Sequence, residues 1–192
     1  RALRIRHKAS GECVTAYDVR QVLFYPFAGG LEDRVGESFR FYGWVEPGAT
    51  VGTSTSLTTT VGLTTADGFK VSRSYELDPV EPILRVTSKV TNPDTAPREA
   101  RLRSHLELDL GVVRDSRVRF VNRGGATTDT DMADTIAGMR EGTYFFEDAT
   151  PAGAWTFSGT KGLTVTQRFN QEDVEFTWIY AYPETLNDLE VE

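Results

Sequence analysis

The 192-residue sequence has little material for covalent or metal cross-links. Cys13 is the only cysteine, so the chain can form neither an internal disulfide nor a thiolate metal cluster, and its compartment is left open. His7 and His105 are the only histidines, whereas a zinc site needs three or four ligands. We therefore expect no metal and no cofactor.

The sequence also lacks long apolar runs and an excess of positive charge. No apolar run approaches the roughly 18 residues that a membrane-spanning helix needs. Lys and Arg number 21 against 28 Asp and Glu, which gives a formal net charge of −7. Nucleic-acid binders need clustered positive charge. We expect neither a membrane nor a nucleic acid as a partner.

Helical patterns are scarce. Residues 130–139 are the only helical candidate, because Met132, Ile136 and Met139 recur at helical spacing. Asp129 or Asp131 could cap the start of this helix. The sequence therefore predicts at most one short helix.

Alternation of apolar and polar residues, which is typical of strands, recurs along the whole chain. Residues 50–66 are rich in Thr and Ser, which suits either a linker or a strand, and β-branched Thr favours the strand. The predicted strands cover 3–6, 19–25, 38–45, part of 50–66, 69–77, 83–91, 98–110, 118–122, 143–146, 154–157, 162–169 and 174–182. The pattern predicts an all-β protein, an antiparallel β-sandwich. We expect one domain over residues 1–192, belonging to a longer protein because the chain opens within a strand pattern and stops abruptly.

Two of these segments form the clearest pattern. Residues 83–91 and 98–110 both alternate strictly, and the turn-forming segment 92–97 with its two prolines separates them. This arrangement predicts that the two strands pair with each other as an antiparallel hairpin.

The second of these strands carries the most chemistry. Because strand side chains alternate between faces, one face is predicted to hold Leu102, Ser104, Leu106, Leu108 and Leu110. The other face is predicted to hold Arg101, Arg103, His105, Glu107 and Asp109.

The charged face has two interpretations. It is either a solvated outer surface or the floor of a polar cleft, in which such groups bind sugar hydroxyls while aromatic rings stack on sugars. The aromatic residues expected nearby are Trp44, Trp178 and Tyr180. The candidate ligand-binding residues are thus Arg103, His105, Glu107 and Trp178, and His105 and Glu107 are the candidates for catalysis.

Other candidate sites are weaker. His7 is expected to have a structural role at an exposed strand end, and no Gly-x-Ser-x-Gly elbow supports a serine hydrolase. Asp129, Asp131 and Asp134 could suggest calcium, but their spacing does not match the EF-hand pattern, and helix capping explains them more simply.

A resemblance to a known superfamily rests on three segments. Tyr75–Pro97 followed by His105 resembles the central hairpin of the galactose mutarotase-like superfamily, with a strand ending in Val-Thr-Asn, a turn and a return strand carrying a His. Tyr25–Gly30 resembles the early glycine-rich turn of that superfamily, and Asn187–Glu192 resembles its last strand. The superfamily includes aldose epimerases and the large sandwich domains of many glycoside hydrolases.

The resemblance implies a supersandwich that binds sugar on a concave sheet face. It matches His105 to the first of two histidines that mutarotases use, but no histidine follows His105, and neither Glu184 nor Glu190 clearly matches their late general base. Three hypotheses remain open. The chain is a carbohydrate-binding or accessory domain that works beside neighbouring domains, a sugar epimerase using His105 with a Glu, or a structural packing domain without a ligand.

Overall fold

A computed structural model describes residues 5–12, 14, 30–35, 46–52, 57–65, 67–132, 143–182 and 186–191. The chain divides into two compact units. Unit 1 comprises Arg34–Leu102 together with Arg1, and unit 2 comprises Ala2–Asp33 and Arg103–Glu192. That residues 1–192 form one domain stays a prediction.

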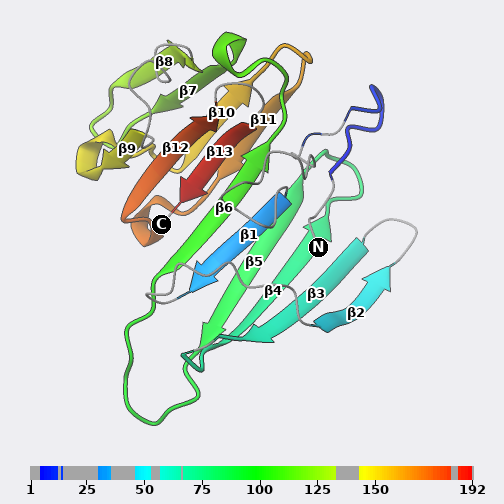
Figure 1. The fold of residues 1–192 in the computed structure, drawn as a ribbon, viewed down its shortest axis with the longest axis vertical. Helices are drawn as coiled ribbons and strands as arrows, with labels where there is room; N and C mark the ends of the chain where they lie inside the picture. The colour runs from blue at the N-terminus through cyan, green and yellow to red at the C-terminus, as the bar shows by residue number, and fades with distance from the viewer. Residues whose placement is uncertain are drawn as a thin grey trace. The chain divides into compact units, whose positions relative to one another are not determined.

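Unit 1 contains a four-stranded sheet in the order β2-β3-β4-β5 (Figure 1). Its strands are β2 (Glu46–Gly52), β3 (Leu57–Thr64), β4 (Lys70–Leu77) and β5 (Leu84–Thr91). The strand predicted within the Thr-rich segment 50–66 is therefore confirmed as β3. Asp67-Gly68 is a hairpin signal in the sequence, and the structure has a turn there, because β3 and β4 pair as a hairpin and Gly68 adopts a φ of 90° that favours glycine.

Unit 2 contains a four-stranded sheet in the order β11-β10-β7-β8. A five-stranded sheet in the order β1-β6-β13-β12-β9 lies mostly in the same unit. The strands of the first sheet are β7 (Arg117–Val121), β8 (Thr127–Asp131), β10 (Ala154–Ser158) and β11 (Thr164–Arg168). Those of the second are β1 (Gly30–Val35), β6 (Leu102–Leu108), β9 (Thr143–Phe146), β12 (Phe176–Tyr182) and β13 (Leu186–Val191).

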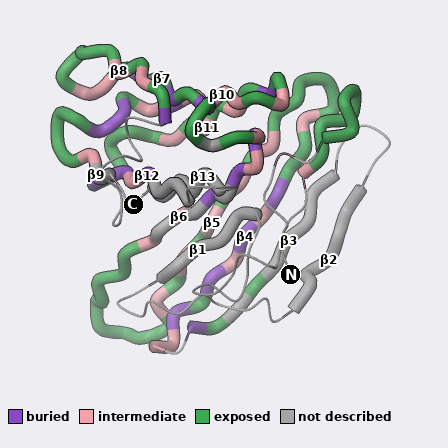
Figure 2. Tube along the Cα trace, turned by 45° about the horizontal axis from the view of Figure 1, so that its top comes forward, coloured by how far each residue is buried: buried purple, intermediate pink, exposed green. Residues whose placement is uncertain are grey.

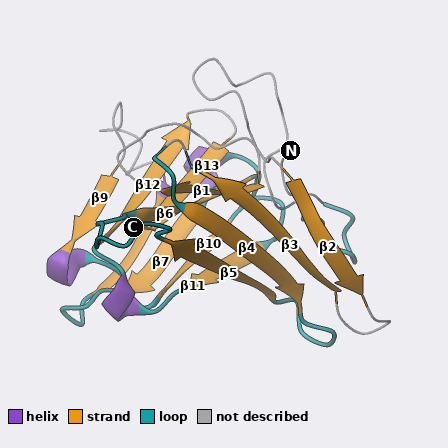
Figure 3. Cartoon of the chain, turned by 90° about the horizontal axis from the view of Figure 1, so that it is seen from below, coloured by secondary structure: helices purple, strands orange, loops and turns teal. Residues whose placement is uncertain are grey.

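The fold class predicted from the sequence is confirmed as all-β with antiparallel sheets (Figure 3). Antiparallel registers join β2–β3, β3–β4, β4–β5, β6–β13, β7–β8, β7–β10, β9–β12, β10–β11 and β12–β13. The packing of these sheets as a sandwich or supersandwich stays a prediction. The strands predicted at 19–25 and 38–45 lie outside the described residues.

The helix predicted over residues 130–139 starts later than predicted, because Met132 is the first helical residue. Thr130 and Asp131 belong to β8, because they pair with Val118 and Arg117 of β7. Residues 133–139 lie outside the described part of the chain. Apart from Met132, the helical residues that the structure describes lie in three 3₁₀ turns, η2 (Val113–Asp115), η3 (Glu147–Ala149) and η4 (Gln171–Asp173).

The core of unit 1 lies on one face of β4. Val71, Arg73 and Tyr75 are buried, whereas the residues between them are half-buried (Figure 2). Phe69 and Val71 form a buried cluster against which Val90 packs. The buried Arg73 is held by hydrogen bonds from its Nε to the Ser88 hydroxyl and from its guanidinium to the Tyr75 hydroxyl.

The prediction that residues 83–91 pair with residues 98–110 is wrong. β5 pairs with β4 in unit 1, whereas β6 pairs with β13 in the five-stranded sheet. The alternation predicted along β5 is nevertheless confirmed, since its residues are half-buried and exposed in turn. Alternation fixes which face a residue occupies, but it does not identify the neighbouring strand.

The core of unit 2 is rich in aromatic residues. Trp155 and Phe157 of β10 are almost completely buried, and the indole Nε1 of Trp155 donates a hydrogen bond to the Gln167 side chain. Phe120 of β7 packs edge-to-face against Phe145 of β9, with ring centroids 5.2 Å apart. This contact joins the four-stranded sheet to the five-stranded sheet within unit 2.

Candidate functional site

The candidate site is built on β6, whose apolar face lies in the core of unit 2 from Leu106 onward, whereas Leu102 belongs to unit 1 and packs against Phe69 and Val71. Leu106, Leu108 and Leu110 are buried, with Leu110 fully inaccessible, while Leu102 and Ser104 are half-buried. The predicted core face of this strand is therefore confirmed. Because successive residues alternate, the intervening positions of β6 belong to the opposite face of the sheet.

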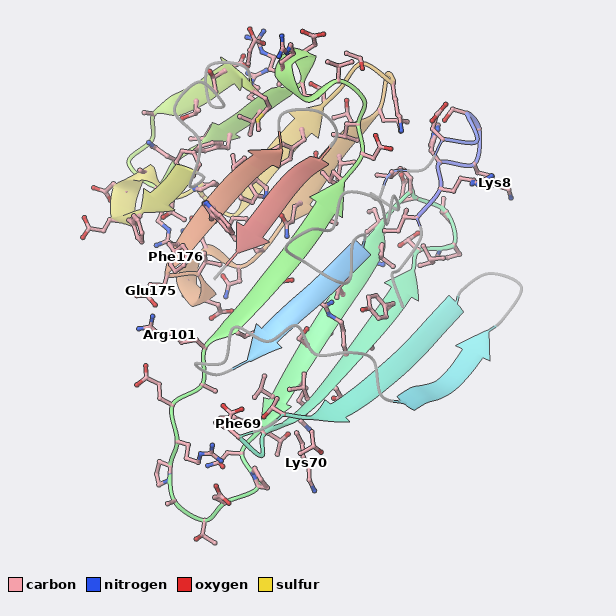
Figure 4. The ribbon with its side chains drawn as sticks, viewed as in Figure 1. Lys8, Phe69, Lys70, Arg101, Glu175 and Phe176 are labelled. Carbon is pink, nitrogen blue, oxygen red and sulfur yellow. The ribbon has the colours of Figure 1, made fainter. Side chains whose placement is uncertain are left out.

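The predicted residues Arg103, His105 and Glu107 occupy these intervening positions. Their side chains lie outside the described part of the structure, so the backbone register is what places them. Two other members of the predicted charged face flank the strand. Arg101, just before β6, is exposed (Figure 4). Asp109, just after β6, is half-buried and forms an ion pair of 2.8 Å with Lys161.

The neighbouring strand β13 adds two carboxylate residues to this face. His105 lies directly opposite Glu190, and Glu107 lies directly opposite Asp188. Directly opposed residues of an antiparallel pair share a face, with Cα atoms about 4.5–5.5 Å apart. Within one strand, same-face positions are about 7 Å apart. The histidine and the three acidic residues thus occupy adjacent positions.

The next strand, β12, adds the aromatic residue that the sequence predicted. Trp178 pairs with Glu190 on one side and with Tyr144 of β9 on the other. One row across four adjacent strands therefore runs His105, Glu190, Trp178 and Tyr144. Trp178 is half-buried, and two strand spacings separate it from His105, a distance of about 10 Å between their backbones.

A second row lies beside the first. Glu107, Asp188 and Tyr180 occupy directly opposed positions on β6, β13 and β12. Tyr180, which the sequence also suggested as a nearby aromatic, therefore shares the face with His105. Trp44, the third aromatic suggested, lies outside the described residues.

Further aromatic residues continue along β12 and β9. Phe176, at the start of β12 (Figure 4), lies opposite Phe146, and their ring centroids are 5.2 Å apart with the planes tilted by 39°. Phe176 is buried, but Phe146 keeps 53% of its surface exposed. The face is thus divided, with acidic and basic positions on β6 and β13 and aromatic positions on β12 and β9.

The reverse face of the same strands has a different character. Thr177 and Ile179 of β12 are fully inaccessible to solvent and share that face with Leu106 and Leu108. An apolar core on one side accounts for why these strands are held in fixed register.

The sequence missed Glu190, Asp188 and Tyr144 as members of the site. The local sequence around Glu190 does not indicate its position relative to His105. The resemblance of Asn187–Glu192 to a last strand was the available signal. Only the pairing of β13 with β6 brings Glu190 to His105.

The weaker candidates make polar contacts with nearby residues. His7 is exposed, and its Nδ1 lies 2.8 Å from the Ser10 hydroxyl within a turn; its structural role stays a prediction. Asp129 does not cap the helix, because it lies within β8 and three residues before Met132, the first helical residue, whereas Asp131 ends β8 directly before Met132. The Arg117 Nε donates to Asp129 at 2.5 Å, and this hydrogen bond lowers the pKa of the Asp129 carboxyl.

The described residues contain neither a metal-binding cluster nor a membrane-spanning helix. Among the side chains that the structure describes, no group of three or more His, Cys, Asp or Glu could hold a metal ion. Asp134 lies outside the described residues. Within the described part of the chain, no helix combines the length and the apolar character needed to cross a membrane.

The chain was compared with models of protein families, with curated proteins and with solved structures, and none of them matches it.

Proposed function

We propose that the chain is a carbohydrate-binding or accessory domain of a carbohydrate-active protein, and that it binds sugar on the face of the five-stranded sheet that carries His105 and Trp178. The observation that carries this proposal is the row His105, Glu190, Trp178 and Tyr144 across four paired strands. The resemblance to the mutarotase-like superfamily suggests the same use of a sheet face.

The chemistry of the row suits a sugar. A pyranose ring presents hydroxyl groups around its edge and C–H groups on its faces. Carboxylates accept hydrogen bonds from hydroxyls, and histidine can donate or accept. The indole of Trp178 is half-buried and its Nε1 is buried, so what it offers a sugar is apolar ring surface. Binding sites of this kind combine an apolar platform with a few polar groups that fix orientation.

A glycan array followed by isothermal titration calorimetry tests the proposal. We expect the wild-type chain to bind at least one class of sugar, and His105→Ala and Trp178→Ala each to weaken binding about tenfold or more, since each removes roughly 1.4 kcal/mol or more of interaction. Arg119→Ala is the matched control, because Arg119 is exposed on β7 of the other sheet in the same unit. An array without any bound sugar, or a His105→Ala variant that binds like the wild type, would overturn the proposal.

The pairing of His105 with Glu190 favours a second candidate, sugar epimerisation of the mutarotase type. Interconversion of anomers needs a proton removed at the anomeric hydroxyl and a proton delivered at the ring oxygen, and a positioned acid and base contribute typically 10²–10⁴-fold each. Histidine titrates near neutral pH and can serve in either role. We expect faster mutarotation of freshly dissolved aldoses by polarimetry, and its loss in Glu190→Gln. A rate equal to that of buffer would exclude catalysis while leaving the binding proposal in place.

A further inference from the structure

The end of β9 has two unusual features. Phe146 is its last residue and is 53% exposed, although it lies on the same face as Trp178. Glu147 follows with a φ of 51°, and within the described residues it is the one non-glycine residue with a positive φ. Residues held in this sparsely populated region cluster at ligand sites, where the surrounding structure maintains the strain.

The position of Phe146 relative to Trp178 is set by strand pairing. Trp178 lies opposite Tyr144, so Phe146, two residues further along β9, is its diagonal neighbour. Diagonal neighbours of this kind are about 7–8 Å apart. The buried Phe176 supports the Phe146 ring from the side, with ring centroids 5.2 Å apart.

We propose that Phe146 is a second aromatic platform and that the face accordingly binds a linear oligosaccharide rather than a single sugar. This inference rests on the proposed carbohydrate binding. β13 and β6 lie on one side of β12 and β9 on the other, so a single pyranose ring stacked on Trp178 and turned toward the charged positions does not also cover the Phe146 ring. A chain of sugars extending toward the end of β9 covers both platforms. The turn at Glu147 leads the backbone away after Phe146 and leaves the ring accessible.

The test uses the complete chain and calorimetry with cello-, xylo- and manno-oligosaccharides of one to six units. Affinity is expected to rise by about tenfold between the single sugar and the longer members of the series that binds, which is the size of effect of one aromatic stacking contact. Phe146→Ala is expected to abolish this rise and leave the affinity for the single sugar unchanged. Trp178→Ala is expected to weaken binding of every member.

Val121→Ala is the matched control, because Val121 is also a large exposed apolar residue at the end of a strand in unit 2. Unchanged circular dichroism and melting temperature confirm that each variant is folded. If the wild type binds the single sugar as tightly as the longer chains, or if Phe146→Ala keeps the rise with length, the second platform is excluded while carbohydrate binding stands. If the wild type binds none of the three series and no glycan on an array, the proposed function itself fails and this inference fails with it.

Discussion

The strands β5 and β6 have nearly the same sequence pattern and different partners. Both alternate apolar and polar residues in the sequence; β5 shows that alternation as half-buried and exposed residues in turn, and the described residues of β6 are the half-buried or buried members of its apolar face. Yet β5 pairs with β4, which immediately precedes it, whereas β6 pairs with β13, the last strand of the chain. The periodicity of a strand therefore predicts its faces and leaves its neighbour undetermined.

Local turn contacts support the pairing of β5 with β4, although they do not decide it alone. Asp78 closes the turn between β4 and β5, because its Oδ1 accepts hydrogen bonds from the backbone N–H groups of Val80 and Glu81, each at 3.0 Å. Its Oδ2 accepts a hydrogen bond of 2.9 Å from Arg85 on β5. These contacts involve residues at most seven positions apart, so they can form before any long-range pairing.

The turn between β5 and β6 is also closed by side-chain hydrogen bonds to the backbone, but the two strands do not pair with each other. Asn92 accepts a hydrogen bond from the backbone of Asp94 and donates one to the carbonyl of Ala96, as an Asx-type turn does. The predicted turn is thus present, but the strands on its two sides belong to different sheets. A turn motif bends the chain without requiring that the flanking strands pair.

Truncating the apolar face of β6 is expected to have the largest effect on stability. Leu108 is 1% exposed, so Leu108→Ala is expected to lower the free energy of unfolding by about 2–5 kcal/mol through lost burial and the cavity left behind. Leu84→Ala on β5 is expected to cost less, because Leu84 is only half-buried. Chemical denaturation followed by circular dichroism measures both.

The control for this comparison is Arg101→Ala, which removes an exposed side chain just before β6 and is expected to change stability by less than about 1 kcal/mol. If Leu84→Ala and Leu108→Ala lower the free energy of unfolding equally, the difference in burial between Leu84 and Leu108 does not determine how much each stabilises the fold.

Asp78 is expected to make the stability of unit 1 dependent on pH. The backbone N–H groups of Glu81 and Val80 and the Arg85 guanidinium lower the pKa of the Asp78 carboxyl from 3.8 to about 2. A carboxyl with a lowered folded-state pKa stabilises the fold above its unfolded pKa, and this contribution is lost as pH falls from about 3.8 toward 2. Asp78→Asn is expected to lower the melting temperature at pH 6 more than at pH 2.

Melting curves of the wild type and Asp78→Asn at both pH values provide the measurement. Asp94→Asn is a suitable control, since Asp94 also forms an ion pair, of 2.8 Å with Arg98, but is more exposed. A constant difference between wild type and Asp78→Asn across this range would contradict the proposed role of the Asp78 charge.

Of Leu108, Asp78 and Arg98, we expect Arg98 to contribute least to stability. Its guanidinium lies 4.2 Å from the centroid of the Phe69 ring and donates a hydrogen bond of 2.7 Å to the Asp67 carbonyl. These contacts hold the segment between β5 and β6 against the turn between β3 and β4. Arg98→Ala is expected to cost about 0.5–1 kcal/mol, the usual value of an exposed cation–π contact.

Arg98→Lys separates charge from shape, because lysine keeps the charge but lacks the planar fork of donors. Thermal denaturation of both variants is the measurement. We expect Arg98→Lys to recover only part of the loss, and full recovery would mean that charge alone accounts for the effect.

The sequence by itself determined the class of the fold and the faces of its strands. Alternation predicted the buried leucines of β6, the alternating burial of β5 and most strands from Leu57 onward, because the two-residue period of a strand is a local property. Gly68 and Asp67 marked the β3–β4 hairpin for the same local reason. The sequence also placed Arg103, His105 and Glu107 on one face of a strand.

Tertiary structure alone decided which strands are neighbours. Glu190 lies 85 positions after His105 in the printed sequence, and only the pairing of β13 with β6 makes them opposite. The same holds for Trp178, which joins the row through β13, and for Thr130 and Asp131, whose pairing with β7 replaced a predicted helix start. Such contacts depend on burial of whole sheet faces and on long loop closures, and the local pattern of a strand contains neither.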